Sequence, residues 1–460
     1  MAQNAIQNTS LKTVPSPKGH FLVGSLPEIR RDLLQTFSDG FAEFGDIVRF
    51  KVGPSELYVI GSPDYAQEML VTKKAVFQKP YREDKPFGLA LILGRGLLTN
   101  PDTDSWLTQR RMMQPMFHRN SINTMTDKMI AGGEDMLARW DESYQDGATF
   151  NLSHEMMKVT LDIINRTMFS ANVMADADDI GSMVETALHF IAKRVRNPFA
   201  LPLSTPLPTY RAFNNATHQI DSLIYNLINQ RRNSGENHDD LLDMLLNARD
   251  EDTGEGMTDL QLRDEVMTIF GAGHETTANG LTWAWYRLSQ HPDVLEKLQN
   301  EVDTVLEGRT PTREDLQNLP YTLAVFEEVM RLHPPAPITI RMNDVDATLG
   351  GYHIPAGTRV IVSFYHIHRH VDYWNDPETF NPDRFLPENK TEIDRHAYLP
   401  FGGGQRMCIG NHFALMEAQL LLVMMVQKVE LKLLPDHDPK HEVAITLRPK
   451  YGMQMTVHRR

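Results

Sequence analysis

The chain has 460 residues of ordinary globular composition, of which 41% are hydrophobic and 23% are charged. Its 46 basic and 60 acidic side chains give a formal net charge of -14, which argues against a nucleic-acid-binding protein because such proteins carry a basic stripe. The single cysteine, Cys408, excludes disulfides within the chain, a cysteine-bound iron–sulfur cluster and a multi-cysteine zinc site.

The N-terminal segment, residues 1–19, is expected to be a polar tail, since it contains no apolar run of the kind found in a signal peptide or membrane anchor. A later apolar run, Leu420–Val426, is far shorter than the roughly 20 residues of a membrane span. No linker, repeat or low-complexity stretch divides the chain. The sequence therefore predicts a cytoplasmic protein with one domain, residues 1–460, and no membrane anchor.

The first elements in chain order mix strand and helix signals. Arg49–Ile60 predicts two short strands around a turn at Gly53, Pro54 and Ser55. Asp104–Phe117 predicts a helix, and Asn151–Leu245 predicts several helices. Prolines break this helical region and predict a surface connection between two helices; they are Pro198, Pro202, Pro206 and Pro208.

A long helix is the clearest element, running over about Asp259–Gln290. Thr258 and Gln261 form a capping box at its start, and His291-Pro292 closes it. At 1.5 Å per residue the helix spans about 48 Å.

The remaining elements follow in order, and they add helices and a smaller β region. We expect a helix at Pro320–Leu332, strands at Thr339–Arg341, Gly351–Ile354 and Thr358–Ser363, a final helix at about Ile409–Val429, and a hairpin of Val443–Leu447 with Met453–Val457 around Pro449–Gly452. The fold class is mainly α, with a smaller β region.

The segment before the final helix, Phe401–Gly410, contains three consecutive glycines and the sole cysteine. Glycines let a backbone fold tightly and approach a flat ligand. Because Cys408 lies at the start of a helix, the helix dipole and free N–H groups are expected to favour its thiolate. A lone cysteine is more often an inert buried residue, so its neighbours carry the interpretation.

The interior of the long helix has an unusual composition at Gly271–Thr277. Gly271 and Gly273 each cost about 1 kcal/mol relative to alanine, and the Thr276 hydroxyl can bond the carbonyl of Ala272. Together they predict a local groove wide enough for a diatomic ligand. The alternative is a glycine pair that lets two helices pack closely. His274 is interpreted as a packing or surface residue, because its helical turn offers no second metal ligand.

Charged and aromatic pairs occur at helical spacing elsewhere. Glu328 and Arg331 lie three residues apart, and Trp106 and Arg110 lie four apart, so each pair shares a helix face. A solvated surface pair is the alternative for the first. The alternating His366, His368 and His370 suggest zinc on one face of a strand, but no carboxylate motif accompanies them and we do not favour a zinc site.

Phe401, Gly402, Gly404, Arg406, Cys408 and Gly410 match the signature Phe-Gly-x-Gly-x-Arg-x-Cys-x-Gly without a gap. In this respect the chain resembles the cytochrome P-450 family. The resemblance implies a single triangular domain with haem b between a long distal helix and a proximal helix. It further implies that Cys408 is the axial iron ligand, that Phe401 packs beside the sulfur and that Arg406 pairs with a haem propionate; Gly402 and Gly410 complete the cofactor segment.

The same resemblance gives roles to the other patterns. Thr276 and Glu275 deliver protons to iron-bound oxygen, and Ala272 and Gly273 line the oxygen site. Ala272 stands where one lipid-oxidising branch has a glutamate linked to haem, so the haem is expected to be non-covalent apart from the Cys408 bond. The other implied roles are a structural triad of Glu328, Arg331 and Arg384, and propionate contacts from Trp106, Arg110 and Arg341.

The resemblance, which covers Pro15 to the C-terminal hairpin, also implies the substrate pocket. Its lining would come from Tyr81–Leu98, the connection near Ala200, and a set of mostly apolar residues: Ile269, Pro337, Ile338, Thr339, Ile445 and Thr446. An apolar lining implies a lipophilic substrate, such as a fatty acid, a terpenoid or a steroid-like molecule, which the enzyme hydroxylates with O2.

The chain ends soon after the haem segment, so electrons are expected from a separate ferredoxin or flavodoxin with its NAD(P)H reductase. We hypothesise that Arg110, Arg111 and Arg119 form a basic patch for an acidic partner. A monomer is expected. The competing interpretations are a haem-dependent peroxygenase or isomerase, which Glu275 and Thr276 argue against, a non-enzymatic haem sensor or carrier, and a zinc hydrolase.

Overall fold

A computed structural model of the protein describes residues 11–80, 88–170, 177–195, 197, 200–236, 238 and 240–460. Contacts within the chain divide it into two compact units. The first unit comprises Met1–Pro80, Ile338–Pro377 and Asp394–Met407, and the second comprises Tyr81–Pro337, Glu378–Ile393 and Cys408–Arg460. The expected single domain, residues 1–460, stays a prediction.

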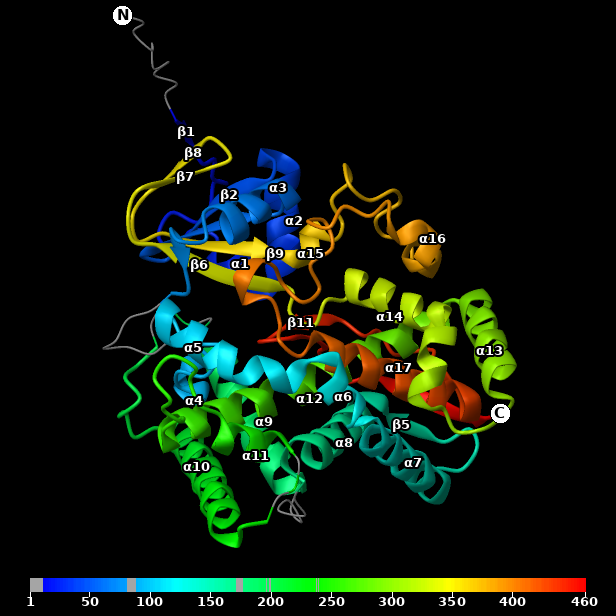
Figure 1. Ribbon diagram of the computed structural model, residues 1–460. Coiled ribbons are helices and arrows are strands. Elements are labelled where there is room, and N and C mark those ends of the chain that lie inside the picture. The colour runs from blue at the N-terminus through cyan, green and yellow to red at the C-terminus, as the bar shows by residue number, and fades with distance from the viewer. Residues whose placement is uncertain are drawn as a thin grey trace, which may run out of the picture. The chain divides into compact units, whose positions relative to one another are not determined.

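The first unit is built on a five-stranded sheet, with the order β2-β3-β9-β6-β4 (Figure 1). The strands are β2 (Ile47–Val52), β3 (Ser55–Ile60), β9 (Arg359–Ser363), β6 (Ile338–Asn343) and β4 (Phe77–Gln78). β3 and β9 pair in parallel, and the other neighbours pair antiparallel. The two strands predicted at residues 49–60 are confirmed, because the positive φ of Gly53 permits the tight turn between them.

A smaller sheet of the first unit has the order β1-β8-β7, with β1 (Lys12–Thr13), β8 (Tyr352–Ile354) and β7 (Ala347–Leu349). Val14, next to β1, is buried in the core. The expected polar tail is therefore wrong for residues 12–14, whereas residues 1–10 lie outside the described residues. The helices of this unit are α1 (Leu26–Arg31), α2 (Leu33–Phe44), α3 (Pro63–Gln67) and α15 (Phe364–Ile367).

The second unit is mainly helical and surrounds α12 (Asp259–Gln290), whose predicted bounds and capping box are confirmed. The helix is buried along most of its length, as expected for a helix with neighbours on all sides. It packs against α8 (Leu152–Ile164), α10 (Pro208–Ser234), α14 (Pro320–Leu332) and α17 (Asn411–Lys428). The predicted bounds of α14 are confirmed, and α17 begins two residues later than predicted.

The other helices of the second unit lie around this core. The predicted helix at residues 104–117 is α5 (Thr103–Met113) followed by the 3-10 turn η2 (Gln114–Phe117). The chain leaves the helical state between α9 (Ala177–Val195) and α10, where the prolines predict a connection; Pro198 itself lies outside the described residues. The further helices are α4 (Ala90–Leu93), α6 (Arg119–Asn123), α7 (Thr126–Ser143), α11 (Leu241–Asn247), α13 (Pro292–Leu306) and α16 (Pro387–Lys390).

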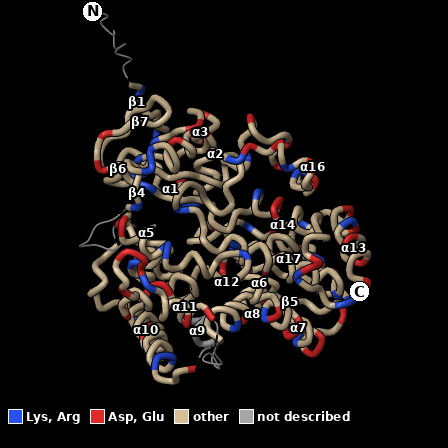
Figure 2. Tube along the Cα trace, in the orientation of Figure 1, with Lys and Arg blue, Asp and Glu red and all other residues tan. Residues whose placement is uncertain are grey.

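Short turns and π-helical segments complete the chain. They are η1 (Glu68–Thr72), η3 (Asn165–Phe169), η5 (Arg313–Asn318), η6 (Pro382–Phe385) and η7 (Gly404–Arg406). Figure 2 shows acidic and basic residues interspersed along the outer helices α7, α10 and α13. Within the described part of the chain, no helix is both long enough and apolar enough to cross a membrane.

The predicted C-terminal hairpin is wrong in its pairing. β11 (His441–Val443) pairs with β12 (Leu447–Pro449), around a turn that the Ala444 N–H closes onto the Thr446 carbonyl. β13 (Gln454–Arg459) instead pairs with β10 (Val429–Leu433) and β5 (Thr149–Asn151). β13 pairs five residues with β10 on one edge and three residues with β5 on the other, so segments outside the predicted hairpin occupy both of its edges.

Candidate functional site

The glycine-rich segment, Phe401–Met407, belongs to the first unit. Gly402 and Gly404 adopt φ values of 73° and 68°, a conformation that residues with a side chain rarely adopt. A Cβ on Gly404 would lie 2.2 Å from the carbonyl oxygen of Leu70. The segment therefore requires glycine at this position in order to approach η1, which confirms the tight backbone expected from the sequence.

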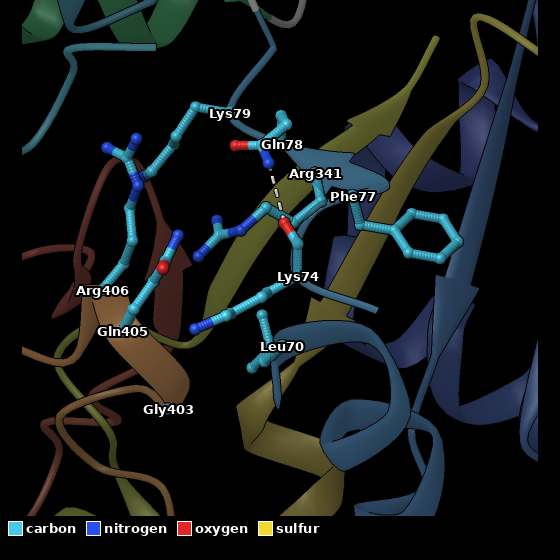
Figure 3. A pocket seen from close by; sticks show the side chains of 9 residues that line it. All are labelled: Leu70, Lys74, Phe77, Gln78, Lys79, Arg341, Gly403, Gln405 and Arg406. Carbon is cyan, nitrogen blue, oxygen red and sulfur yellow. Dashed lines mark hydrogen bonds between the residues drawn. The ribbon is translucent and has the colours of Figure 1, made fainter. Parts of the chain in front are cut away.

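Beside this segment lies a recess that gathers cations. Three cationic side chains converge there: Lys79 follows β4, Arg341 lies on β6 and Arg406 lies on η7 (Figure 3). Burial and the two arginines lower the pKa of Lys79 to about 7, and burial lowers the pKa of Arg341 to about 10. None of the residues lining the recess is acidic; they are Leu70, Lys74, Phe77, Gln78, Lys79, Arg341, Gly403, Gln405 and Arg406. We call this set the cationic recess.

Within the recess, Arg341 is held by its neighbours on β6, since its Nη1 donates to Thr339 Oγ1 at 3.0 Å and to the carbonyl of Ile340 at 2.9 Å. Lys79 was missed in the sequence analysis. It follows β4, whose antiparallel register pairs Gln78 with Met342 and brings Lys79 toward Arg341. A lone lysine after a two-residue strand carries no sequence signal of this placement.

Cys408 begins the part of the motif that belongs to the second unit, and its side chain is exposed. Removal of water by the surrounding protein raises the pKa of the thiol, and the Gly410 backbone N–H and the Arg110 charge oppose that rise. The expected bond from a loop N–H to the sulfur is thus present. The expectation that the helix start favours the thiolate stays a prediction.

Trp106 and Arg110 share one face of α5, as predicted. The Arg110 guanidinium lies 5.4 Å from the centre of the Trp106 ring, a cation–π contact. Burial lowers the pKa of Arg110, and the charge of Cys408 counteracts this, so the two residues interact electrostatically. The buried Trp106 Nε1 donates to the Leu97 carbonyl at 2.9 Å. A carboxylate approaching this N–H would have to compete with that bond.

The middle of α12 remains α-helical, yet Ala272 is exposed between long buried stretches. The predicted bond is confirmed, because Thr276 Oγ1 donates to the Ala272 carbonyl at 2.9 Å. A Cβ on Gly273 would lie 2.6 Å from Ile164 of α8, as the helix-packing alternative expects. A Cβ on Gly271 would meet only Leu93, at 3.8 Å. The two glycines therefore differ: Gly273 permits packing, and Gly271 keeps the helix surface open beside Ala272.

Glu275 is buried on α12 and takes part in a polar network. Thr446 Oγ1 donates to Glu275 Oε1 at 2.6 Å, and Asn279 Nδ2 donates to Thr446 Oγ1 at 3.1 Å. His274 is buried and its Nδ1 lies 2.7 Å from the Phe270 carbonyl, which confirms it as a packing residue. Thr446, expected to line the substrate pocket, is thus engaged by Glu275.

The predicted triad is confirmed in the second unit. Arg331 donates through Nε and Nη2 to the two Glu328 oxygens at 2.7 and 2.8 Å, and neither side chain is exposed. Arg384 of η6 approaches Glu328 Oε1 at 3.6 Å. The Asn381 backbone N–H also donates to Glu328, so the carboxylate is fully compensated.

A family model described as cytochrome P-450 matches residues 14–457. The chain belongs to this family. The mainly α P-450 fold is confirmed by the crystal structure of the haem domain of cytochrome P450DA, with a TM-score of 0.89, 28% sequence identity and coverage of 98% of both chains.

Curated relatives of this P-450 are oxygenases. The chain is 33% identical over 415 residues to cyclooctat-9-en-7-ol 5-monooxygenase of Streptomyces melanosporofaciens, covering 90% of this chain and 88% of that protein. It is 32% identical over 405 residues to pentalenene oxygenase of Streptomyces avermitilis, covering 87% and 88%. The chain is therefore a P-450 monooxygenase, and its family implies a haem-thiolate iron cofactor, O2, an organic substrate and redox partners.

The expected substrate-lining residues of this P-450 fall in both units. In the second unit, Ile269 and Pro337 are buried and Ile445 is half-buried; in the first, Ile338 and Thr339 are half-buried. Residues 81–87 of the expected lining lie outside the described residues. The rest of that segment packs on α12, where a Cβ on Gly94 would clash with Asp264 and the Leu97 N–H donates to Glu265 Oε2 at 2.9 Å.

The expected basic patch of this P-450 needs correction. Arg111 Nη2 lies 3.4 Å from Asp250 and 3.0 Å from Asp252, so two carboxylates neutralise its charge. Arg110 interacts with Cys408, as described above. Arg119 is exposed, and its charge lowers the pKa of the neighbouring His412, after the larger effect of burial. Among the described residues, Arg119 forms no ion pair with an acidic side chain, and its charge is exposed.

The histidine run lies on α15 and the turn after it, and not on a strand. His366 contacts the hydroxyls of Ser363 and Ser38 at 2.7 and 2.9 Å, and burial lowers its pKa to about 3. His368 Nε2 accepts the Leu399 N–H at 2.8 Å. Among the residues that the structure describes, no group of three His, Cys, Asp or Glu side chains is arranged to hold a metal ion.

Proposed function

We propose that the protein is a haem-thiolate monooxygenase that hydroxylates a terpenoid hydrocarbon or alcohol, with Cys408 as the axial ligand of haem b. The observation that carries the proposal is the placement of the sole cysteine. Its side chain is exposed, its sulfur accepts the Gly410 N–H, and Arg110 lies within electrostatic reach. Hydrogen bonding and a cation stabilise a thiolate ligand once a metal replaces the thiol proton.

The cationic recess supports a cofactor with carboxylates. Lys79, Arg341 and Arg406 are brought together in a recess whose lining residues include no acid, so their like charges repel one another. Haem carries two carboxylates, and charge-assisted bonds to them would offset that repulsion. We assign the carboxylate contacts to these three residues and to Arg110, with Trp106 supporting Arg110 through its ring. Bound haem would supply the redox chemistry that activates O2.

The residues of α12 have separate tasks in this proposal. Ala272 and Gly271 leave the helix surface open, which makes room for a small diatomic molecule. The Thr276 hydroxyl holds a proton at Oγ1 beside that opening, and the preceding residue, Glu275, holds or releases a proton at its carboxylate. Gly273 serves close packing against α8, and its backbone remains on the same turn as Ala272.

The substrate class is proposed from the relatives and from the lining residues. The two curated relatives are named for a hydrocarbon, pentalenene, and for an alcohol, cyclooctat-9-en-7-ol. Ile269, Pro337 and Ile445 are apolar, as a site for such molecules requires. Fatty acids and steroid-like molecules are the weaker alternatives. We further propose a cytoplasmic monomer that receives electrons from a ferredoxin with an NAD(P)H reductase, docked near Arg119.

The decisive experiment is spectroscopic. The reduced, carbon-monoxide-treated protein should show the red-shifted Soret band of thiolate coordination, and Cys408→Ser should abolish it. A normal band in Cys408→Ser would overturn the proposed ligand. Turnover with peroxide alone, and none with O2 and reductant, would instead favour a peroxygenase.

The substrate class is tested by the shift in the haem spin state on ligand binding. We expect sesquiterpene and diterpene hydrocarbons or alcohols to produce the shift at lower concentration than fatty acids or steroids of similar size. A preference for fatty acids would overturn the terpenoid assignment and leave the monooxygenase intact.

A further inference from the structure

The turn between β11 and β12 lies along one stripe of α12. Glu275, Asn279 and Trp283 are spaced four residues apart, so their side chains share a helix face. Each of them bonds to the turn: Glu275 and Asn279 to the Thr446 hydroxyl, and Trp283 Nε1 to the Leu447 carbonyl at 3.2 Å. Residues on three consecutive turns of α12 therefore hold the β11–β12 connection in place.

The hydroxyl of Thr446 has a fixed direction in this arrangement. It accepts from Asn279 Nδ2 at 3.1 Å, and an amide nitrogen can only donate. Its single proton is then available to Glu275 Oε1, at 2.6 Å. Glu275, Thr446 and Asn279 are 6%, 5% and 6% exposed, so water competes little for these bonds. Asn279 therefore donates to Thr446, Thr446 donates to Glu275, and this chain of hydrogen bonds fixes one oxygen of the Glu275 carboxylate.

The backbone around Thr446 is also held. The Leu447 N–H donates to the Pro335 carbonyl at 2.9 Å, and the Ala444 N–H donates to the Thr446 carbonyl at 3.0 Å. Trp283, which bonds Leu447, is itself stacked on His333 with ring centres 4.4 Å apart. A side chain on this turn has little freedom to follow a moving carboxylate.

We propose that Thr446 is a positioning residue for Glu275, and not a substrate-lining residue: it fixes Oε1 and leaves Oε2 as the oxygen that exchanges protons. The inference rests on the proposed function, in which Glu275 handles protons. Among the described residues no group hydrogen-bonds Oε2. A carboxylate with both oxygens free can rotate about its side-chain bonds, whereas one fixed oxygen defines where the other points.

Three variants test the positioning role. Thr446→Val removes the hydroxyl and keeps the branched shape, Thr446→Ser keeps the hydroxyl, and Thr282→Val is the matched control. Thr282 is a fully buried threonine of α12, the helix that carries Glu275, and among the described residues its hydroxyl bonds only the Ala278 carbonyl.

The functional readout is electron coupling in the haem-loaded enzyme, with a plant-type ferredoxin and its NADPH reductase as donors. Uncoupled turnover follows O2 + NADPH + H⁺ → H2O2 + NADP⁺, so peroxide per NADPH measures it. We expect Thr446→Val to raise peroxide yield or slow NADPH oxidation by roughly threefold to tenfold, because a misplaced proton-transfer group is costly. Thr446→Ser and Thr282→Val should behave as the parent protein.

A second readout does not depend on turnover. The unfolding equilibria of Thr446→Val, Glu275→Leu and the double variant form a double-mutant cycle, in which either substitution removes the bond between the two side chains. We expect the unfolding equilibrium constant of the double variant to rise by less than the product of the increases in the two single variants. The reason is that the first substitution already removes the bond, so the second has no bond left to remove. Multiplicative effects would mean that the two side chains do not interact, and would overturn the proposal.

The outcomes separate this inference from the proposed function. If the unfolding experiment shows that the two side chains interact but the peroxide yield of Thr446→Val is normal, Thr446 is a structural residue only. That result would overturn its positioning role. In that case the carbon-monoxide band of the parent protein would still support the monooxygenase. Loss of that band would overturn the proposed function, whatever the cycle shows.

Discussion

Two clusters of ionisable side chains differ in how their charge is balanced. In the second unit, Glu328 lies between Arg331 and Arg384, and the pair Glu328–Arg331 is fully buried. In the first unit, the cationic recess places Lys79, Arg341 and Arg406 together without an acidic residue in its lining. The first cluster pairs its charges within the polypeptide, whereas the second brings three cations together in a recess whose lining residues include no acid.

The difference separates scaffold from ligand site. A compensated cluster tolerates deep burial because each charge has a partner, and it loses stability when one partner is removed. An uncompensated cluster of like charges costs stability by itself and recovers that cost when an anion binds. The same distinction applies on the surface. Arg111 has two carboxylate partners, whereas Arg119 has no carboxylate partner among the described residues.

The largest effect is expected from breaking the compensated cluster. Arg331→Leu leaves the carboxylate of Glu328 buried without its main partner, and should lower the free energy of unfolding by about 3–5 kcal/mol. Denaturant titration of the haem-loaded protein measures this. Arg313→Ala is the control, because its pair with Glu314 is exposed and should contribute at most about 1 kcal/mol. Equal losses in both variants would contradict the comparison.

Removing a cation from the recess should act on cofactor binding instead. Lys79→Met should weaken haem binding about tenfold to a hundredfold, the value of one or two charge-assisted bonds, and should not destabilise the apoprotein, because repulsion with Arg341 and Arg406 is relieved. Haem transfer to apomyoglobin gives the affinity. Lys74→Met is the matched control, since Lys74 is exposed at the edge of the same recess. A destabilised apoprotein with unchanged haem affinity would contradict the assignment.

Glu417 is a third case, because its carboxyl group is buried and its oxygens have no hydrogen-bond partner among the described residues. Burial raises the pKa of Glu417, on α17, from 4.5 to about 8, and the neighbouring Thr277 offsets this only in part. The folded state therefore holds a proton that the unfolded state releases between pH 4.5 and 8, so stability falls as pH rises through this window. Glu417→Gln should remove up to about 1.4 kcal/mol of that fall per pH unit. Unfolding at pH 5, 6.5 and 8 tests it; parallel curves for both proteins would refute it.

The smallest effect is expected at the surface arginines. Arg119→Ala should slow reduction by a ferredoxin severalfold at low salt and reduce the dependence of the rate on ionic strength. Arg111→Ala should change the rate less, because Asp250 and Asp252 already cancel its charge. Stopped-flow reduction at several salt concentrations distinguishes them. An equal or larger effect of Arg111 would restore the patch expected from the sequence.

Local signals predicted the parts of the molecule that local chemistry decides. The capping box of Thr258 and Gln261 and the His291-Pro292 stop located α12. The three-residue spacing of Glu328 and Arg331 placed them on one helix face, and the resemblance to the family predicted that they form a buried ion pair. The bond from Thr276 to Ala272 follows from helical geometry alone.

The failures arose where distant segments decide the outcome. Lys79 reaches the recess only through the register of β4 with β6, and β13 pairs with β10 across the chain instead of closing a local hairpin. The neutralisation of Arg111 likewise requires a loop some 140 residues away along the chain, at Asp250.

The peptide groups of Leu97 have a consequence for how α5 and α12 are joined. Its carbonyl accepts from Trp106 on α5, and its N–H donates to Glu265 on α12. Burial raises the pKa of Glu265 to about 8, yet a protonated carboxyl still offers a carbonyl oxygen as acceptor. This one residue therefore bridges the two helices whether or not the acid is ionised, and the bridge is insensitive to acidity over the neutral range.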